Sequence, residues 1–134
     1  MPTGHFDAAA LSADMFNSRP ALRAVLETLL PWLVETRSQL AEAITRGEAE
    51  AFGHVLHRMR GALAQLRAAD AVSHIRVLEE QSAQDGGPTI PSEHPALAAL
   101  DAELDALASE VAAYLATLRD DAEQKTSYPP TEQL

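Results

Sequence analysis

The feature that most constrains the fold is a pair of long apolar seams in which hydrophobic side chains recur every three or four residues. One seam spans 22–44 and the other spans 97–118. An α-helix turns once in 3.6 residues, so this spacing places the seam side chains on one helical face. The seams are therefore predicted to be two long helices of a bundle. Their residues are Leu22, Leu26, Leu29, Leu33, Thr36, Leu40, Ile44, Leu97, Leu100, Leu104, Leu107, Val111, Tyr114 and Leu118.

Two shorter helices are predicted between these seams, from Glu48 to about Leu66 and from Ala71 to about Gln84. Arg46-Gly47 is a typical helix end, and the short connection after it makes the next helix antiparallel. Asp70 is predicted to cap the helix that begins at Ala71. The expected core positions of the two helices are Phe52, Val55, Leu56, Met59, Leu63, Leu66, Ala71, Val72, Ile75, Leu78 and Ala83.

The predicted fold class is an all-α, up-down-up-down four-helix bundle with a short extra N-terminal helix. That extra helix is expected from Phe6 to Met15, where Ala-rich sequence surrounds Leu11. Pro31 falls inside the first long helix, where we expect a kink because the apolar phase continues past it. The predicted organisation is a flexible N-terminus at 1–5, one bundle domain at 6–119 and a disordered tail at 120–134.

Composition narrows the possible functions. The chain has 134 residues, no cysteine and a formal net charge of -10. The missing cysteines exclude disulfides, thiolate chemistry and Cys-based zinc sites, and favour a cytoplasmic location. The acidic balance argues against nucleic-acid binding, which depends on Lys and Arg. No apolar run is long enough to span a bilayer. We therefore expect a cytoplasmic monomer with protein partners and no membrane contact.

His57 is the candidate reactive residue. On a helical wheel it lies about 140° from Phe52, on the polar side of its helix. Gly53, Gly61 and Ala64 lie beside it, so an incoming molecule is expected to reach the imidazole without meeting bulky side chains. Local positive charge is also expected there, because three of the few basic residues cluster around His57. They are Arg58, Arg60 and Arg67.

This segment resembles the histidine-containing phosphotransfer (HPt) domain of two-component phosphorelays. The family motif, His-x-Leu-Lys-Gly, is followed on the next helix by Leu-Glu. The resemblance extends over about residues 15–119. Two positions depart from the family, which commonly has Lys at Arg60 and Gly at Arg67. The matching residues in this chain are His57, Met59, Arg60, Gly61, Leu78 and Glu79.

The resemblance implies a phosphorelay intermediate, not an ATP-dependent kinase. His57 would accept a phosphoryl group from an aspartyl phosphate of one receiver domain and pass it to another. Glu79, at the edge of its helix's core face, is expected to accept a hydrogen bond from the imidazole and orient it. Arg60 would neutralise phosphate charge. The expected docking surface consists of Gly53, His54, Arg58, Gly61 and Ala64.

The implied partners are response-regulator receiver domains and hybrid sensor kinases. No cofactor of its own is expected, since receivers would supply a divalent metal such as Mg²⁺. A rival metal site, formed by His54, His57 and Glu50, lacks the paired Glu-x-x-His motifs of di-metal bundles. We therefore predict no metal site. A second interpretation is an inert helical adaptor that binds receivers without phosphotransfer. His5, His74 and His94 have no partner that the pattern identifies.

Overall fold

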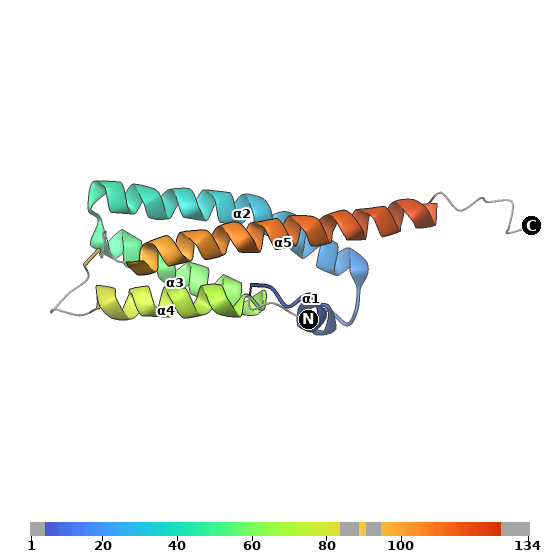
Figure 1. Cartoon of the computed structure of the whole chain (residues 1–134), viewed down its shortest axis with the longest axis horizontal. Helices are drawn as coiled ribbons and strands as arrows, with labels where there is room; N and C mark the ends of the chain where they lie inside the picture. The colour runs from blue at the N-terminus through green and yellow to red at the C-terminus, as the bar shows by residue number, and fades with distance from the viewer. Residues whose placement is uncertain (1–4, 84–88, 91–94, 127–134) are drawn as a thin grey trace, which may run out of the picture.

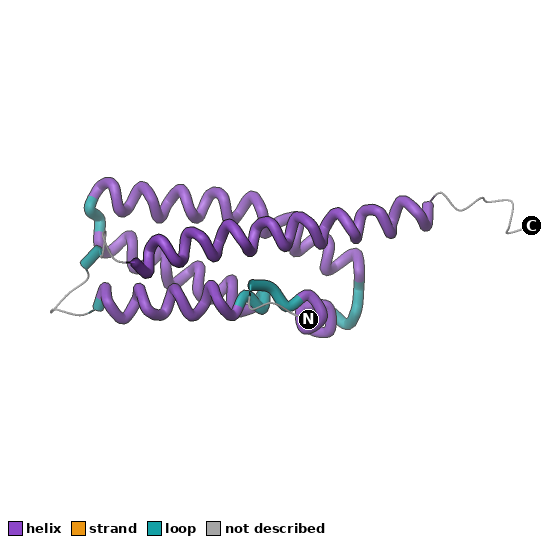
Figure 2. The backbone as a smooth tube through the Cα atoms, viewed as in Figure 1, coloured by secondary structure: helices purple, strands orange, loops and turns teal. Residues whose placement is uncertain are grey.

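The computed structural model describes residues 5–83, 89–90 and 95–126. Within these ranges the chain is almost entirely helical and contains no strand, which confirms the predicted all-α fold class (Figures 1 and 2). The helices are α1 (Ala8–Asp14), α2 (Arg19–Arg46), α3 (Ala49–Gln65), α4 (Ala69–Ser82) and α5 (Pro95–Thr126).

The four longer helices form an antiparallel bundle. α2 and α4 run in one direction and α3 and α5 run in the other, so the chain passes up, down, up and down (Figure 1). Each helix packs on two neighbours, because α3 contacts α2 and α4, and α5 contacts the same two helices. α3 and α5 therefore occupy diagonal corners of the bundle. The predicted topology is confirmed.

The short helix α1 lies across the end of the bundle where α2 begins (Figure 2). Asp7 caps it by accepting a hydrogen bond from the Ala10 backbone N–H at 3.0 Å. A bidentate ion pair then ties α1 to the turn between α3 and α4, with Arg67 Nε and Nη2 both 2.9 Å from the carboxylate of Asp14. The extra helix is thus fixed to the bundle by packing and by charge.

Both ends of α2 have the capping chemistry that local propensity favours. Ser18 caps α2 by accepting a hydrogen bond from the Ala21 backbone N–H at 3.3 Å. α2 continues through Pro31 and ends at Arg46, followed by the C-cap Gly47, whose left-handed φ of 67° glycine adopts without a steric penalty. α2 thus begins with a polar capping side chain and ends with a glycine, as local propensity favours.

The start of α4 differs from the sequence-based prediction. Its N-cap is Ala68, without a side-chain hydrogen bond, and Asp70 lies inside the first turn. The prediction that Asp70 is the cap is wrong because Arg67 adopts a left-handed φ of 63°, which reverses the chain early enough for the helix to begin at Ala69. Ala83, expected in the core, is exposed just beyond the helix end.

The ends of the domain also differ from the predicted bounds. α5 continues to Thr126, past the boundary expected at residue 119. The segment 120–126 contains Ala, Glu, Gln and Lys, which have favourable helix propensity, so its polar composition does not end the helix. Most of the predicted flexible N-terminus (1–4) and the tail 127–134 lie outside the described residues. The sequence also indicates a helix start at Ser92, which lies outside them too.

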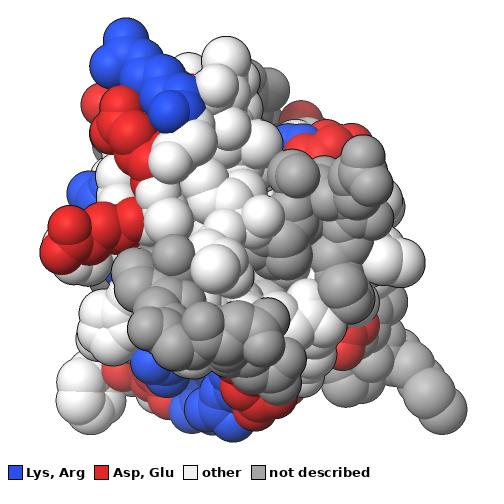
Figure 3. Space-filling view, turned by 90° about the vertical axis from the view of Figure 1, so that its left-hand side faces the viewer, with Lys and Arg blue, Asp and Glu red and all other residues white. Residues whose placement is uncertain are grey.

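The core runs the length of the bundle and is built from the predicted seams. Leu26, Phe52, Leu56, Leu107 and Val111 are completely buried. Thr36 fills the gap in the first seam and is 4% exposed, as its spacing indicates. At the end of the bundle with the α2–α3 connection, acidic and basic side chains of the described residues are interspersed (Figure 3). The described residues on that face therefore form no large patch of one sign.

Candidate functional site

His57 lies in the middle of α3 with its side chain 72% exposed. Leu56, which precedes it, and Met59, two residues further on, are completely buried and anchor the helix to the core. Because the same helix supplies both core contacts and the histidine, the imidazole is presented to solvent from a rigid element.

Arg60 and Glu79 form an ion pair next to His57. Arg60 Nε donates a hydrogen bond to Glu79 Oε1 at 2.6 Å, which joins α3 to α4. Both side chains are partly buried, with 32% of Arg60 and 25% of Glu79 exposed. The pairing leaves Glu79 at the edge of the bundle core, where the helical wheel placed it, and gives its charge a partner.

The imidazole contacts this ion pair through Nδ1. Nη2 of Arg60 lies 3.2 Å from His57 Nδ1, whereas Oε2 of Glu79 lies 3.8 Å from the same atom. The second distance is too long for a hydrogen bond. The direct hydrogen bond expected between Glu79 and the imidazole is therefore replaced in this structure by a contact through Arg60, whose planar fork reaches both groups at once.

The arginines expected to concentrate charge around His57 point toward different parts of the bundle. Arg58 Nη2 donates to Gln39 Oε1 of α2 at 2.7 Å, and Arg67 pairs with Asp14 of α1. The hydrogen bond from Arg67 lowers the pKa of the Asp14 carboxyl. Arg60 is thus the arginine that contacts the imidazole. Arg58, the next residue after His57, binds the neutral side chain of Gln39, so its positive charge is not neutralised by that contact.

The surface around His57 is open, as the sequence predicts. Gly61, His54 and Ala64 are exposed, and Gly53 is half-buried. A Cβ built on Gly53 or Gly61 would meet no neighbouring atom within 4 Å. Neither glycine is therefore needed for close helix packing among the described residues, and both leave room for an approaching molecule.

The rival metal set of His54, His57 and Glu50 is not assembled in the described part of the chain. Donor atoms that do come within 4.8 Å of one another belong to a different set, formed by His5, Asp70 and Glu103. No residue of this second set belongs to the candidate site.

His5 has a partner that its sequence position does not reveal. Its Nδ1 is hydrogen-bonded to Glu103 Oε2, a carboxylate that is 6% exposed in α5, and lies 3.8 Å from Asp70. The hydrogen bond that the Glu103 carboxylate accepts raises the pKa of the His5 imidazole, as do the charges of Glu110 and Asp70. His5 therefore has a partner that the sequence pattern did not identify, and the buried Glu103 carboxylate gains the partner that it requires.

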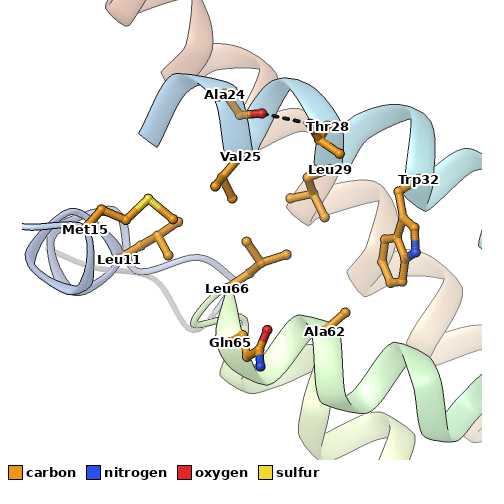
Figure 4. A pocket seen from close by; sticks show the side chains of 10 residues that line it. All are labelled: Leu11, Met15, Ala24, Val25, Thr28, Leu29, Trp32, Ala62, Gln65 and Leu66. Atoms are coloured by element: carbon orange, nitrogen blue, oxygen red, sulfur yellow. Dashed lines mark hydrogen bonds between the residues drawn. The ribbon is translucent and has the colours of Figure 1, made fainter. Parts of the chain in front are cut away.

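A separate apolar groove of about 490 Å³ lies between α1, α2 and the C-terminal end of α3 (Figure 4). Thr28, which borders it, donates a hydrogen bond from its hydroxyl to the Ala24 carbonyl at 2.9 Å, so most of the wall is apolar. None of the candidate site residues lines this groove. Its walls are Leu11, Met15, Ala24, Val25, Thr28, Leu29, Trp32, Ala62, Gln65 and Leu66.

Comparison with solved structures identifies the architecture. The chain superposes with a TM-score of 0.72 on the HPt domain of a hybrid sensor histidine kinase from Shewanella, over 85% of this chain and 96% of that domain. This chain has the HPt-domain fold. The two sequences are 16% identical, so the similarity establishes the fold alone. The function has to be argued from the residues of the candidate site. No protein-family model and no curated protein matches the sequence.

The structure shows how arginine is accommodated at position 67. The turn after α3 contains a left-handed residue even though that residue is not glycine. A left-handed non-glycine residue costs about 1–2 kcal/mol. The bidentate contact of Arg67 with Asp14 offsets part of this cost and docks α1. The sequence signal that could have indicated this contact is the pairing of an acidic α1 end with a basic turn residue.

Proposed function

We propose that this protein is a cytoplasmic phosphorelay intermediate that carries a phosphoryl group on His57 between receiver domains. The observation that carries the proposal is the exposed imidazole in the middle of α3, bordered by two glycines and backed by the Arg60–Glu79 pair. The HPt-domain fold of the described chain supports the same function.

The proposed chemistry requires little from the protein beyond positioning. Neutral imidazole is well populated near neutral pH and attacks phosphorus through a ring nitrogen. Phosphoryl transfer then depends on alignment and on neutralising the charge of the equatorial oxygens. Arg60 supplies positive charge next to the ring. Glu79 restricts the positions that Arg60 and the imidazole can adopt.

The proposed partners are receiver domains of response regulators and of hybrid sensor kinases. A receiver must bring its aspartyl phosphate in line with the imidazole, which requires a bare helical surface. Gly53, Gly61 and Ala64 provide that surface, and His54 and Arg58 border it. The divalent metal of the receiver would stay on the receiver. No helix within the described residues is long and apolar enough to cross a membrane.

The competing proposal is an inert adaptor that binds receivers through the same surface. The two proposals differ in one observable, the covalent label on the chain. The purified protein should be mixed with a panel of receiver domains carrying a ³²P-labelled aspartyl phosphate. A carrier acquires label from at least one receiver and transfers it to a second, unlabelled receiver. Binding to receivers without any label on this protein would favour the adaptor.

A further inference from the structure

The position of Arg60 determines which nitrogen of His57 carries the proton. Arg60 Nη2 lies 3.2 Å from Nδ1 while its Nε donates to Glu79 at 2.6 Å. A guanidinium has only donors, so Nδ1 must act as the acceptor in this contact. The neutral imidazole in this arrangement therefore carries its proton on Nε2.

This tautomer is unsuited to phosphoryl transfer at the outer face of the ring. Nδ1 faces the Arg60–Glu79 pair, and Nε2, on the other side of the ring, has no hydrogen-bond partner among the described residues. Nε2 is the nitrogen that a docked receiver can reach. A nitrogen that carries the ring proton has no lone pair to offer, so the resting ring is not nucleophilic at this position.

We propose that Arg60 is a positioning residue that holds His57 in this resting tautomer and releases it when a phosphorylated receiver docks. The inference rests on the proposed phosphocarrier function. The phosphoryl group offers Arg60 a doubly charged partner in place of neutral Nδ1, and the 32% exposed side chain can swing toward it. The imidazole is then free to exchange its proton with water.

The reacting state follows from the position of Glu79. Once Arg60 leaves Nδ1, Oε2 of Glu79 is 3.8 Å from that nitrogen and needs to close by about 1 Å to accept a hydrogen bond. Glu79 then stabilises the tautomer with its proton on Nδ1, and Nε2 gains a lone pair. The switch couples nucleophilicity to docking, because the ligand of Arg60 is the group to be transferred.

The transfer step balances without a further reactant. Water takes the proton from Nε2 and supplies one to Nδ1, so the ring stays neutral. The Nε2 lone pair forms the N–P bond while the P–O bond to the aspartyl group breaks, and the carboxylate leaves with the electron pair. The product carries phosphate on Nε2 and hydrogen on Nδ1, next to Glu79.

An arginine suits this arrangement better than a lysine. Its fork places two donors at fixed positions, one on Glu79 Oε1 and one on His57 Nδ1. A lysine ammonium at this position would be a single point that contacts one group at a time. The substitution Arg60→Lys should therefore preserve the positive charge and weaken control over the tautomer.

The test measures the His57 tautomer by ¹⁵N NMR on the 134-residue chain, at a pH where the ring is neutral. The wild type should show the Nε2–H form. Arg60→Ala should shift the population to the Nδ1–H form, which Glu79 then stabilises, and Arg60→Lys should be intermediate. Arg58→Ala is the matched control, since Arg58 binds Gln39 and should leave the tautomer unchanged. An unchanged tautomer in Arg60→Ala would overturn the inference.

A second measurement separates this inference from the proposed function. After phosphotransfer from a labelled receiver, NMR of the phosphohistidine should place the phosphoryl group on Nε2, and attachment at Nδ1 would refute the switch. If Arg60→Ala changes the tautomer but no variant ever accepts a phosphoryl group, the phosphocarrier function fails while the role of Arg60 in the resting protein stands.

Discussion

Replacing Gly61 should make the protein more stable and less able to receive a phosphoryl group. Gly61 lies inside α3, is exposed and has open space at its Cβ position. Glycine in a helix interior costs about 0.5–1 kcal/mol relative to alanine, chiefly through the entropy of the unfolded chain. No contact in the described structure offsets this cost, so Gly61→Ala should recover it.

The magnitude converts to a measurable shift in melting temperature. For a domain of this size about 1 kcal/mol corresponds to roughly 3–5 °C, so Gly61→Ala should melt about 2–5 °C higher than the wild type. Gly61→Glu should melt at or above the wild-type temperature. It also places a long, negative side chain one turn from His57, where it blocks the receiver and repels phosphate. Receiver binding and labelling should both be lost.

Thermal unfolding followed by circular dichroism measures the first effect, and label transfer measures the second. Ala112→Glu adds the same charge on α5, at the diagonal corner of the bundle, and should leave transfer unchanged. A lower melting temperature for Gly61→Ala would mean that the glycine is required for packing. Normal transfer by Gly61→Glu would refute the proposed docking surface.

Two further predictions concern the elements that hold the N-terminal region. The hydrogen bond with Glu103 raises the folded-state pKa of His5, and the charges of Glu110 and Asp70 contribute. The stability that this contact provides is therefore complete below the unfolded-state pKa of about 6.5. It is lost as the pH rises through the folded-state pKa. The difference in melting temperature between wild type and His5→Gln should thus shrink from pH 5.5 to pH 8.5, and a constant difference would contradict the assignment. The second prediction concerns Arg67→Gly in a variant that lacks the Asp14 carboxylate. This substitution should raise the free energy of unfolding, measured by urea titration, by up to about 1 kcal/mol, because glycine relieves the strain of the left-handed backbone. A further loss of stability would refute that explanation.

Helical periodicity was sufficient to predict the bundle, because the fold is determined mainly by burial of the apolar side chains that produce this periodicity. The seams from Leu22 and from Leu97 place their residues in the core regardless of loop details, and the short link at Gly47 fixes the antiparallel direction. Loop and end effects were less predictable. The start of α4 depends on a left-handed Arg67, and propensity gives no reason to expect that conformation at an arginine.

The positions of the site residues were predictable, but their contacts were not. The helical wheel places His57 outside and Glu79 at the edge of the core, and the structure agrees. Which side chain bonds to which depends on rotamers and on the spacing between α3 and α4. Arg60, and not the imidazole of His57, is therefore hydrogen-bonded to Glu79. His5 is hydrogen-bonded to Glu103, 98 residues away in sequence.

The most direct test of the central claim is to locate the phosphoryl group on the chain. The wild type and the variants His57→Gln and His54→Gln should be incubated with a labelled receiver, and the product treated with acid and with alkali. A phosphoramidate is lost in acid and survives alkali, so we predict an acid-labile label on the wild type and on His54→Gln and none on His57→Gln. A label that persists in His57→Gln, or one that is alkali-labile, would contradict the account.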